Sequence, residues 1–432
     1  MANYVILGMQ WGDEGKGKIV DVFAKKMDIA VRYQGGNNAG HTVITAQGEE
    51  HKLHILPSGV LHPHLTCLIG QGTVIDPRVL VSEMQGLAAK VGDNMAKIAI
   101  SDNAHVIMPY HVVIDQEEEK MRGSSAIGTT QKGIGPCYAD KINRRGIKIS
   151  DLLNKENFKY KLKHNLHHVN HVLNNLYKLP NISFDKIYYE YMECISYLKP
   201  YVTNGTSLLA QSLHSGDNIL FEGAQGAMLD IDYGSYPFVT SSSSSSAGLF
   251  SGSGIFVRNF NMIIGVLKAY STRVGAGPFL SEQDNEDGEQ LFNIGNEVGV
   301  TTGRKRRCGW LDLNVARHSI VTSGVNMIAL TKLDILSHFE EIPICVAYEK
   351  QGVVYKHVPY IAEDIRLSSP VYKVFKGWKC DISHARTYDE LPEEAQAYIE
   401  FIETELRVPV GAVSVGPRAE QIIKIHPDLF FE

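Results

Sequence analysis

Three acidic and two basic side chains share one glycine-rich stretch near the N-terminus. Residues 9–21 read MQWGDEGKGKIVD, and Gly12 to Lys18 fit G-x-x-x-x-G-K, a pattern whose backbone N–H groups surround a polyphosphate. The next residue is normally a Ser or Thr that binds Mg²⁺, but here it is Ile19. Because a strand-like run (4–8) precedes the stretch and a helical pattern follows, a nucleotide loop is favoured over a glycine-rich turn with solvated lysines.

A second stretch has the form with which proteins recognise guanine. Residues 327–334, MIALTKLD, are an apolar strand followed by Thr331, Lys332, Leu333 and Asp334. A carboxylate can accept hydrogen bonds from the ring N–H and the exocyclic amine of guanine, donors that adenine does not present as a pair. Alone, the pattern also fits a strand that ends in a charged turn. Together with the phosphate loop, it predicts GTP.

The stretch GGNNAGHTV (35–43) places Asn38 and His41 in a loop whose glycines permit close backbone approach to a ligand. His41 is either structural or a proton donor or phosphate contact. Loops that follow successive parallel strands share the carboxyl edge of the sheet. We therefore expect Asp13 and His41 to face one another across a substrate.

Three further stretches carry groups that suit anions. AIGTTQKGIGP (126–136) contains Thr130, and the segment 221–241 contains Gln225 and Thr240, although each also fits a plain loop. VTTGRKRRCGW (300–310) is a solvated basic turn, a nucleic-acid segment or a site for a small anion. An acidic chain and the forked geometry of Arg favour the small anion. HNLHHVNH (164–171) lacks acidic or Cys co-ligands and is interpreted as an exposed helix face.

The elements that must position these loops alternate in type along the chain. Strand-like runs and helical stretches alternate over the first hundred residues, which predicts an α/β fold with a mostly parallel sheet. Residues 151–216 have helical spacing and predict a helical subdomain, and the serine run 241–246 predicts a mobile loop. Strand-like runs return at 218–226, 262–271, 325–334, 342–350 and 406–417. We expect one large domain over 1–432.

Composition limits the class of protein. A formal net charge of -6 and a pI near 6.3 argue against a general nucleic-acid binder. The six cysteines are scattered without a C-x-x-C pair, which indicates reduced thiols. The sequence shows no signal peptide and no apolar run near the ~20 residues of a membrane span. We expect a cytoplasmic protein with no membrane or nucleic-acid partner.

Seven ordered motifs resemble those of the adenylosuccinate synthetase family: QWGDEGKGK, GGNNAGHT, IGTTQKGIGP, FEGAQGAMLDID, YSTRVGAGPF, TTGRKRRCGWLD and LTKLD. The resemblance extends from residue 4 to 417. It implies a GTP-dependent ligase that joins IMP and L-aspartate through a 6-phosphoryl-IMP intermediate, giving adenylosuccinate, GDP and phosphate in the first committed step from IMP to AMP. It also implies one Mg²⁺ per subunit and a homodimer.

By the same resemblance, Asp13 is the base that removes the N1 proton of IMP and also binds Mg²⁺, with the Gly40 carbonyl as a further ligand. His41 is the acid, and Lys16 and Gln225 complete the catalytic set. Ile19 cannot bind the metal, so Asp13, within the loop itself, would supply the ligand that a Ser or Thr normally provides at position 19. Arg144 would reach IMP in the neighbouring subunit.

The ligand sets implied by the resemblance are larger. The GTP set is Gly12, Asp13, Glu14, Gly15, Lys16, Gly17, Lys18, Gly40, His41, Thr42, Arg306, Lys332, Leu333, Asp334, Ser414, Val415 and Gly416. The IMP set is Asp13, Asn38, Ala39, Gly40, His41, Thr130, Arg144, Gln225, Thr240 and Arg304. The aspartate set is Val300, Thr301, Thr302, Gly303, Arg304, Lys305 and Arg306. The chain departs from the family pattern at Asn37, where the family often has His, and in the serine run.

Three alternatives belong to other classes. A regulatory GTP switch would need a Ser or Thr after the loop lysine, but this chain has Ile19 at that position. A nucleic-acid module using Arg304 to Arg307 would show strongly salt-dependent duplex binding, and the net charge argues against it. An ATP-using ligase is distinguished by Asp334→Asn, which should shift base preference only if the site reads guanine.

Overall fold

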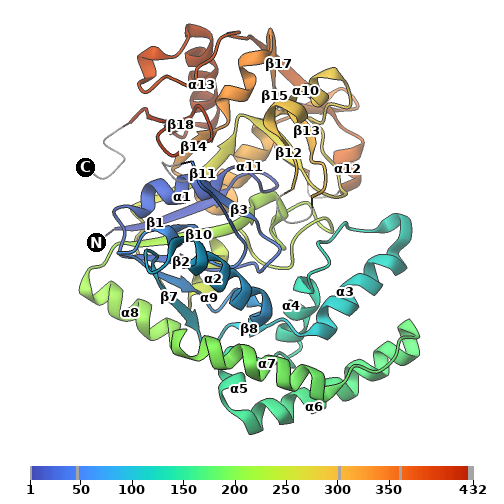
Figure 1. Cartoon of the computed structure of the whole chain (residues 1–432). Coiled ribbons are helices and arrows are strands. Elements are labelled where there is room, and N and C mark those ends of the chain that lie inside the picture. The colour runs from blue at the N-terminus through green and yellow to red at the C-terminus, as the bar shows by residue number, and fades with distance from the viewer. Residues whose placement is uncertain (1, 45–47, 300–302, 360–361, 427–432) are drawn as a thin grey trace.

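The protein is described by a computed structural model that covers residues 2–44, 48–299, 303–359 and 362–426. Within these ranges a ten-stranded sheet has the order β19-β18-β14-β11-β1-β10-β2-β5-β7-β9, and every adjacent pair is parallel except β18 with β19. Its strands are β1 (Asn3–Gly8), β2 (Ile29–Arg32), β5 (Thr66–Ile69), β7 (Lys97–Ser101), β9 (Val202–Thr203), β10 (Ile219–Gly226), β11 (Met262–Lys268), β14 (Met327–Thr331), β18 (Val410–Ser414) and β19 (Ile422–Lys424). The predicted α/β class and mostly parallel sheet are confirmed (Figure 1).

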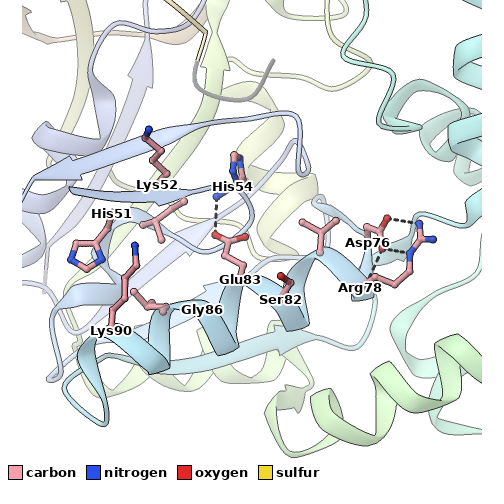
Figure 2. Close-up of a pocket in the computed structure, with 12 residues that line it drawn as sticks. His51, Lys52, His54, Asp76, Arg78, Ser82, Glu83, Gly86 and Lys90 are labelled. Atoms are coloured by element: carbon pink, nitrogen blue, oxygen red, sulfur yellow. Dashed lines mark hydrogen bonds and ion pairs between the residues drawn. The ribbon is translucent and has the colours of Figure 1, made fainter. Parts of the chain in front are cut away.

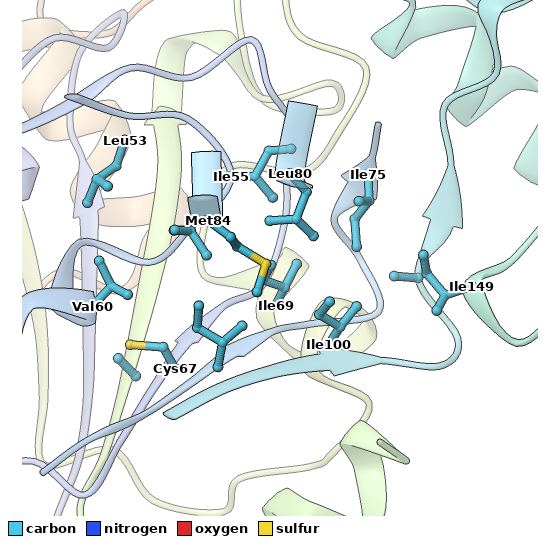
Figure 3. Close-up of a cluster of buried hydrophobic side chains, with 14 of the residues drawn as sticks. Leu53, Ile55, Val60, Cys67, Ile69, Ile75, Leu80, Met84, Ile100 and Ile149 are labelled. Carbon is cyan, nitrogen blue, oxygen red and sulfur yellow. The ribbon is translucent and has the colours of Figure 1, made fainter. Parts of the chain in front are cut away.

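The strands are apolar on both faces because helices cover both faces. Successive residues of β1 alternate between two hydrophobic clusters: Tyr4 and Ile6 join one, while Val5 and Leu7 join the other. The first cluster includes Leu80 and Met84 of α2, which lie beside Ile69 of β5 (Figure 3). The helices are α1 (Lys16–Ala24), α2 (Pro77–Val91), α3 (Pro109–Arg122), α4 (Ile134–Ile142), α5 (Ile149–Leu153), α6 (Lys155–Val172), α7 (Phe184–Leu198), α8 (Gly205–Ser215), α9 (Ala247–Ser253), α10 (Glu286–Gly295), α11 (Leu313–Ser323), α12 (Ala362–Arg366) and α13 (Glu393–Leu406).

A second sheet contains strands that the sequence did not separate from the central one. Its order is β12-β13-β15-β16, with β17 also paired to β15. The strands are β12 (Tyr270–Arg273), β13 (Arg307–Asp312), β15 (Glu341–Lys350), β16 (Val353–Tyr355) and β17 (Ser369–Lys376). β13 begins inside the basic run, so this run leads directly into a strand. Two-stranded sheets are formed by β3 (His41–Ile44) with β4 (Glu50–Leu53) and by β6 (Val74–Ile75) with β8 (His105–Val106).

The predicted helical subdomain over 151–216 is largely helical. α5, α6, a π-helical turn (Leu173–Tyr177) and α7 form its body, and α6 and α7 lie side by side at the end of the molecule opposite to the second sheet (Figure 1). Val202 and Thr203 then return to the central sheet as β9, before α8. His164, His167, His168 and His171 lie on α6. All four are exposed, as expected for a solvent-facing side of a helix.

The prediction that the serine run is a mobile loop is wrong. Ser244 and Ser245 are fully buried, and the Ser244 hydroxyl donates to the carbonyl of Gly226 at 2.8 Å. The buried Asp230 carboxylate accepts from the Ser243 hydroxyl at 2.9 Å and from the Ser245 amide at 2.8 Å. Small hydroxyl side chains suit this segment because each can satisfy a backbone or carboxylate partner at close quarters.

None of the helices in the described part of the chain is long and apolar enough to span a membrane. All six cysteines are free thiols, as the absence of paired motifs predicted.

Candidate active site

The phosphate loop lies between β1 and α1, at the carboxyl edge of the central sheet. Gly12, Asp13 and Gly15 have φ values of 87°, 60° and 86°, so the loop turns through the left-handed region three times. Glycine enters this region freely, and Asp is among the few other residues that tolerate it. Lys16 and Gly17 open α1 and are buried, as the strand–loop–helix prediction requires.

Glu14 accounts for one of the two acids in the loop. Its buried carboxylate accepts from the Gly12 amide at 2.8 Å, from the Gln10 amide at 3.0 Å and from Lys16 Nζ at 2.6 Å. Burial alone would raise the pKa of Glu14, but attraction to Lys16 and the amide donors outweigh it and the pKa is lowered. Glu14 is therefore an internal brace that folds the loop and holds Lys16.

Asp13 is partly exposed and is the first member of a series of ion pairs. Its side chain is 28% exposed, and Oδ2 lies 2.8 Å from Arg306 Nε. Arg306 Nη1 pairs with Glu297 Oε2 at 2.6 Å, and Glu297 Oε1 pairs with Lys332 Nζ at 2.6 Å. These ion pairs therefore connect the phosphate loop with the basic run and the guanine-type segment (Thr331–Asp334), both of which follow it by about 300 residues in sequence.

Glu297 lies at the centre of this chain and was not predicted. It is fully buried, and it also contacts Lys268 Nζ at 3.1 Å and the Tyr270 hydroxyl. Burial raises the pKa of Glu297, but the surrounding cations, Lys268 first, lower it far more, so the carboxylate is ionised. Its local sequence, GNEVG, has no feature that marks it, because its cationic partners come from three other elements.

The guanine-type segment follows β14, as predicted. Thr331 Oγ1 donates to the carbonyl of Glu14 at 2.5 Å, so this segment touches the phosphate loop. Lys332 adopts a φ of 58° and begins the 3₁₀ turn Leu333–His338. Asp334 Oδ1 is buried and has no hydrogen-bond partner among the residues that the structure describes. Burial raises the pKa of Asp334, against the lowering effects of a backbone hydrogen bond and of Lys18.

Lys18 points away from the loop amides, toward the end of β18. Its Nζ donates to Ser414 Oγ at 2.8 Å, to the Gly416 carbonyl at 2.7 Å and to the Gln421 carbonyl at 2.9 Å. Burial lowers the pKa of Lys18 to about 7, although Asp334 and Glu420 act in the opposite direction. Lys18 thus ties the Ser414–Gly416 segment to α1, beside Asp334.

His41 opens β3 and is buried against a carboxylate that the sequence analysis did not single out. Its Nδ1 lies 2.6 Å from Glu222 Oε1, and Nε2 lies 3.3 Å from the Ala224 carbonyl. Glu222 is fully buried in β10 and also accepts from the Ser58 hydroxyl at 2.6 Å. Burial raises the pKa of Glu222, but His41 and Ser58 lower it overall. A His fixed by a carboxylate has a defined orientation.

The position of Glu222 follows from sheet order. The loops after β1 and β2 share the carboxyl edge, as expected, but β10 lies between these two strands and is parallel to both. Its carboxyl end therefore delivers Glu222 and Gln225 to the space between the two loops. The order of strands in a sheet is a non-local property, so the motif FEGAQG shows only that a strand is present.

Hydrogen bonds join some of the segments that carry the predicted IMP residues. Gln225 Nε2 donates to Asn38 Oδ1 at 3.3 Å, and Gln225 Oε1 is buried with no partner in the described part of the chain. Both Arg304 Nη atoms donate to the Gly128 carbonyl at 3.0 Å, which joins the basic run to the loop that carries Thr130. Ala39 and Gly40 precede β3, Thr42 lies in β3, and Thr240 precedes the buried serines. Arg144 follows α4 and is exposed, with a φ of 63°.

Of the predicted aspartate loop, Val300, Thr301 and Thr302 lie outside the described residues. The remainder forms the base of a hairpin: the Gly299 amide donates to the Arg304 carbonyl and the Gly303 amide to the Gly299 carbonyl, each at 2.8 Å. Lys305 Nζ lies 4.3 Å from the centre of the Phe292 ring. The hairpin places Arg304 toward Gly128 and Arg306 toward Asp13.

Comparison with known proteins gives one consistent result. The family model described as adenylosuccinate synthetase matches residues 5–423. The chain is 47% identical over 423 residues to an adenylosuccinate synthetase of Desulfitobacterium hafniense, covering 98% of this chain and 99% of that protein. It is 45% identical over 432 residues to the enzyme of Clostridium perfringens, covering 99% and 100%.

Among solved structures, the fully ligated adenylosuccinate synthetase from Plasmodium falciparum matches with a TM-score of 0.92 and 40% identity, over 98% of this chain and 99% of that chain. A cyanophage S-2L succinoaminodeoxyadenylate synthetase matches with a TM-score of 0.60 at 19% identity, over 98% and 95%, and shows a shared fold.

Proposed function

The chain belongs to the adenylosuccinate synthetase family, and from this premise we propose which of its residues perform each part of the reaction. The family joins IMP and L-aspartate at the expense of GTP, giving adenylosuccinate in AMP biosynthesis, and the chain is a GTP-dependent ligase. The observation that carries the assignment of residues is the ion-pair chain from Asp13 through Arg306 and Glu297 to Lys332. It connects two segments assigned to GTP, the phosphate loop and Lys332–Asp334, with the basic run assigned to aspartate.

Asp13 is proposed as the base. The O6 atom of IMP is a poor leaving group, so it must become a phosphate ester before an amine can displace it. Removal of the N1 proton makes O6 a better nucleophile toward the γ-phosphorus of GTP, and 6-phosphoryl-IMP results. The outward, partly exposed carboxylate of Asp13 suits this task, whereas Glu14 is buried and already bonded. The aspartate amine then attacks C6, and phosphate leaves.

His41 is proposed as the acid that assists phosphoryl transfer, and Lys16 and Gln225 as groups that stabilise the charge developing on the transferred group. Glu222 supports His41 by fixing its ring at Nδ1, which leaves Nε2 as the nitrogen that faces away from the carboxylate. Gln225 has a buried oxygen without a partner in the described chain, so it has hydrogen-bonding capacity for a ligand.

For GTP, we propose that Asp334 reads the guanine base, with Lys332 along the ring and Ser414, Val415 and Gly416 beside it. The buried Asp334 oxygen without a partner supports this proposal, because guanine offers the two donors that it lacks. Residues Gly12 to Gly17 would surround the phosphates. Lys18 would act indirectly, by holding the Ser414–Gly416 segment in place.

For IMP and aspartate, we propose that Asn38, Thr130, Thr240 and Arg304 hold IMP and that the 300–306 loop receives the aspartate carboxylates. Arg144 is proposed to complete the site of a partner subunit in a homodimer, which its exposed position permits. We further propose that residues 1–432 act as one catalytic unit. A cytoplasmic location is also proposed, since six free thiols suit a reducing compartment.

One Mg²⁺ per subunit is proposed, held by Asp13 and the Gly40 carbonyl. The fit is acceptable because Mg²⁺ commonly takes one or two carboxylates, with phosphate oxygens and water completing its shell. When bound, the ion neutralises charge on the β- and γ-phosphates. Since Arg306 contacts the Asp13 carboxylate at 2.8 Å, this arginine must share or release that carboxylate.

The reaction is tested with purified protein, IMP, L-aspartate, GTP and Mg²⁺, by following the ultraviolet change as the 6-oxo purine becomes 6-amino-substituted. The account predicts a signal that needs both substrates and GTP and that ATP does not replace. GTP hydrolysis without this signal, unaffected by omission of aspartate, would instead indicate a GTP switch.

A further inference from the structure

A cavity of about 600 Å³ lies between β4 and α2, and it is lined by none of the residues assigned to the three substrates. Figure 2 shows its two walls, with β4 above the helix and the side chains of α2 rising toward it. His51 and Lys52 come from β4, while Arg78, Gly86 and Lys90 come from α2.

His51 is the unusual member of this lining. Along β4 the side chains alternate between exposed and buried, and His51 is on the buried face with only 3% exposure. Neither ring nitrogen has a hydrogen-bond partner among the described residues, and its nearest carboxylate is the exposed Glu49 at 3.8 Å. A buried polar ring without partners is costly, so it indicates a ligand that supplies them.

Apart from the exposed Glu49, the charged side chain that the cavity presents toward the His51 ring is that of Lys90, which rises from α2 (Figure 2). Lys52 lies on the exposed face of β4, where it pairs with Glu50 at 3.6 Å and points away from α2 (Figure 2). The two acids of the lining are already bonded within the protein. Glu83 accepts from the His54 amide at 2.7 Å and the Ile55 amide at 2.9 Å, and Asp76 pairs with Arg78 at 2.8 Å. The cavity therefore offers the His51 imidazole and the Lys90 ammonium group to an anion.

Gly86 is the part of α2 where the cavity wall carries no side chain. It lies in the interior of α2, where Gly costs about 1 kcal/mol relative to Ala. A Cβ at this position would meet nothing within 4 Å, so the helix does not need Gly for packing. The missing side chain instead leaves space on the face of α2 that lines the cavity.

We propose that this cavity binds a small phosphate-bearing anion through His51 and Lys90. Bound there, the anion braces the β3–β4 hairpin against α2. Within the hairpin, Val43 pairs with His51 and Thr42 with Lys52, next to the pair of His41 with Leu53. The bracing would matter for catalysis only if His41, in the paired strand β3, has its proposed role. The anion site itself does not depend on the proposed function.

The probe is inorganic phosphate, added to the full-length protein in the presence of saturating IMP and GDP. Two-bond ¹H–¹⁵N spectra of the histidine rings report on binding, with His51→Gln identifying the His51 signals among the 17 histidines. The His51 signals should shift saturably. Lys90→Met should weaken this binding by about tenfold, the usual effect of losing one charge-assisted hydrogen bond. Lys155→Met, on the distant α6, is the control and should leave the binding unchanged.

Gly86→Glu places a carboxylate in the cavity and should abolish the shift, whereas Gly86→Ala should retain it. Amide hydrogen exchange over residues 48–53 should slow with phosphate in the wild type and not in Lys90→Met. His51 signals that do not move, or that move equally in Lys90→Met, would overturn the site. Saturable binding without slower exchange would overturn the bracing. Neither readout depends on ligase activity, so failure here is distinct from failure of the proposed reaction.

Discussion

The carboxylate of Asp13 lies 2.8 Å from the guanidinium Nε of Arg306. The first residue belongs to the phosphate loop, and the second ends the basic hairpin. Arg306 also pairs with the buried Glu297, which is shared with Lys268 and Lys332. A shift of the hairpin would therefore change the charge around the proposed base. If the 300–306 loop binds aspartate as proposed, this relationship offers a physical route from that loop to the phosphate loop.

Glu222→Gln should lower kcat by about 10- to 100-fold with little change in the KM for IMP, because it removes the group that fixes His41. Gln keeps the shape of the side chain and loses the charge that stabilises a protonated imidazole. Steady-state kinetics across pH would measure both effects. Ser58→Ala removes only a hydroxyl donor to Glu222 and should cost much less. A Glu222→Gln enzyme with wild-type kcat and pH profile would remove Glu222 from the account.

Asp334→Asn should raise the KM for GTP by about 10- to 100-fold, since one amide cannot accept from both guanine donors. The KM for IMP should stay near the wild-type value. Kinetics with GTP and ATP would measure the change in base preference. Asp185→Asn, at an exposed carboxylate in the first turn of α7, is the control. Unchanged discrimination between GTP and ATP in Asp334→Asn would contradict the assignment of the base site.

Lys18 predicts a pH dependence. Its folded-state pKa of about 7 is below the value of about 10.4 in an unfolded chain, so the unfolded chain binds more protons between these values. The contribution of Lys18 to the free energy of unfolding should therefore rise as pH increases from about 7 to about 10. The KM for GTP should rise over the start of the same range, because a neutral amine cannot donate to Ser414, Gly416 and Gln421 together.

Thermal unfolding and GTP kinetics over this pH range would measure these effects of Lys18, and Lys18→Met should remove both. Lys25→Met, at an exposed lysine just beyond α1, is the control. A KM profile that persists unchanged in Lys18→Met would assign the titration to another group.

Arg144→Leu and Asp13→Asn should each be inactive alone and recover activity when mixed. In a mixed dimer, the subunit with an intact Asp13 receives an intact Arg144 from its partner. Random exchange of subunits in a two-fold dimer then restores about one quarter of the sites. The measurement is ligase activity after equilibration of equal amounts of the two variants. Failure to recover activity in verified mixed dimers would show that Arg144 does not act across the interface.

The sequence located the local motifs well. The phosphate loop, the segment Thr331–Asp334, the strand ends and the helical stretch lie where their patterns predicted, because turn chemistry and hydrophobic periodicity are local. Glu297 and Glu222 were not predicted because their importance is not local. It depends on partners that distant elements of the chain supply. The serine run misled because low-complexity composition does not reveal the buried Asp230 that organises it.

The second sheet shows the same limit. The strand runs at 262–271 and 342–350 were found, but their assignment to separate sheets depends on pairing. A bend after Lys268 divides the first run between β11 and β12, and β15 pairs with β13, β16 and β17. The direction of Lys18 was likewise not predictable, because its three acceptors follow it by about 400 residues.

The most direct test of the central claim is the rate of adenylosuccinate formation by Asp13→Asn, measured spectrophotometrically at saturating IMP, L-aspartate, GTP and Mg²⁺. Asn keeps the shape of the side chain but cannot take the N1 proton. The account predicts a fall in kcat of about 10²- to 10⁴-fold, the usual contribution of a positioned base. Asp93→Asn, an equal change of charge at an exposed position after α2, should retain the wild-type rate. An Asp13→Asn enzyme that forms product at the wild-type rate would contradict the account.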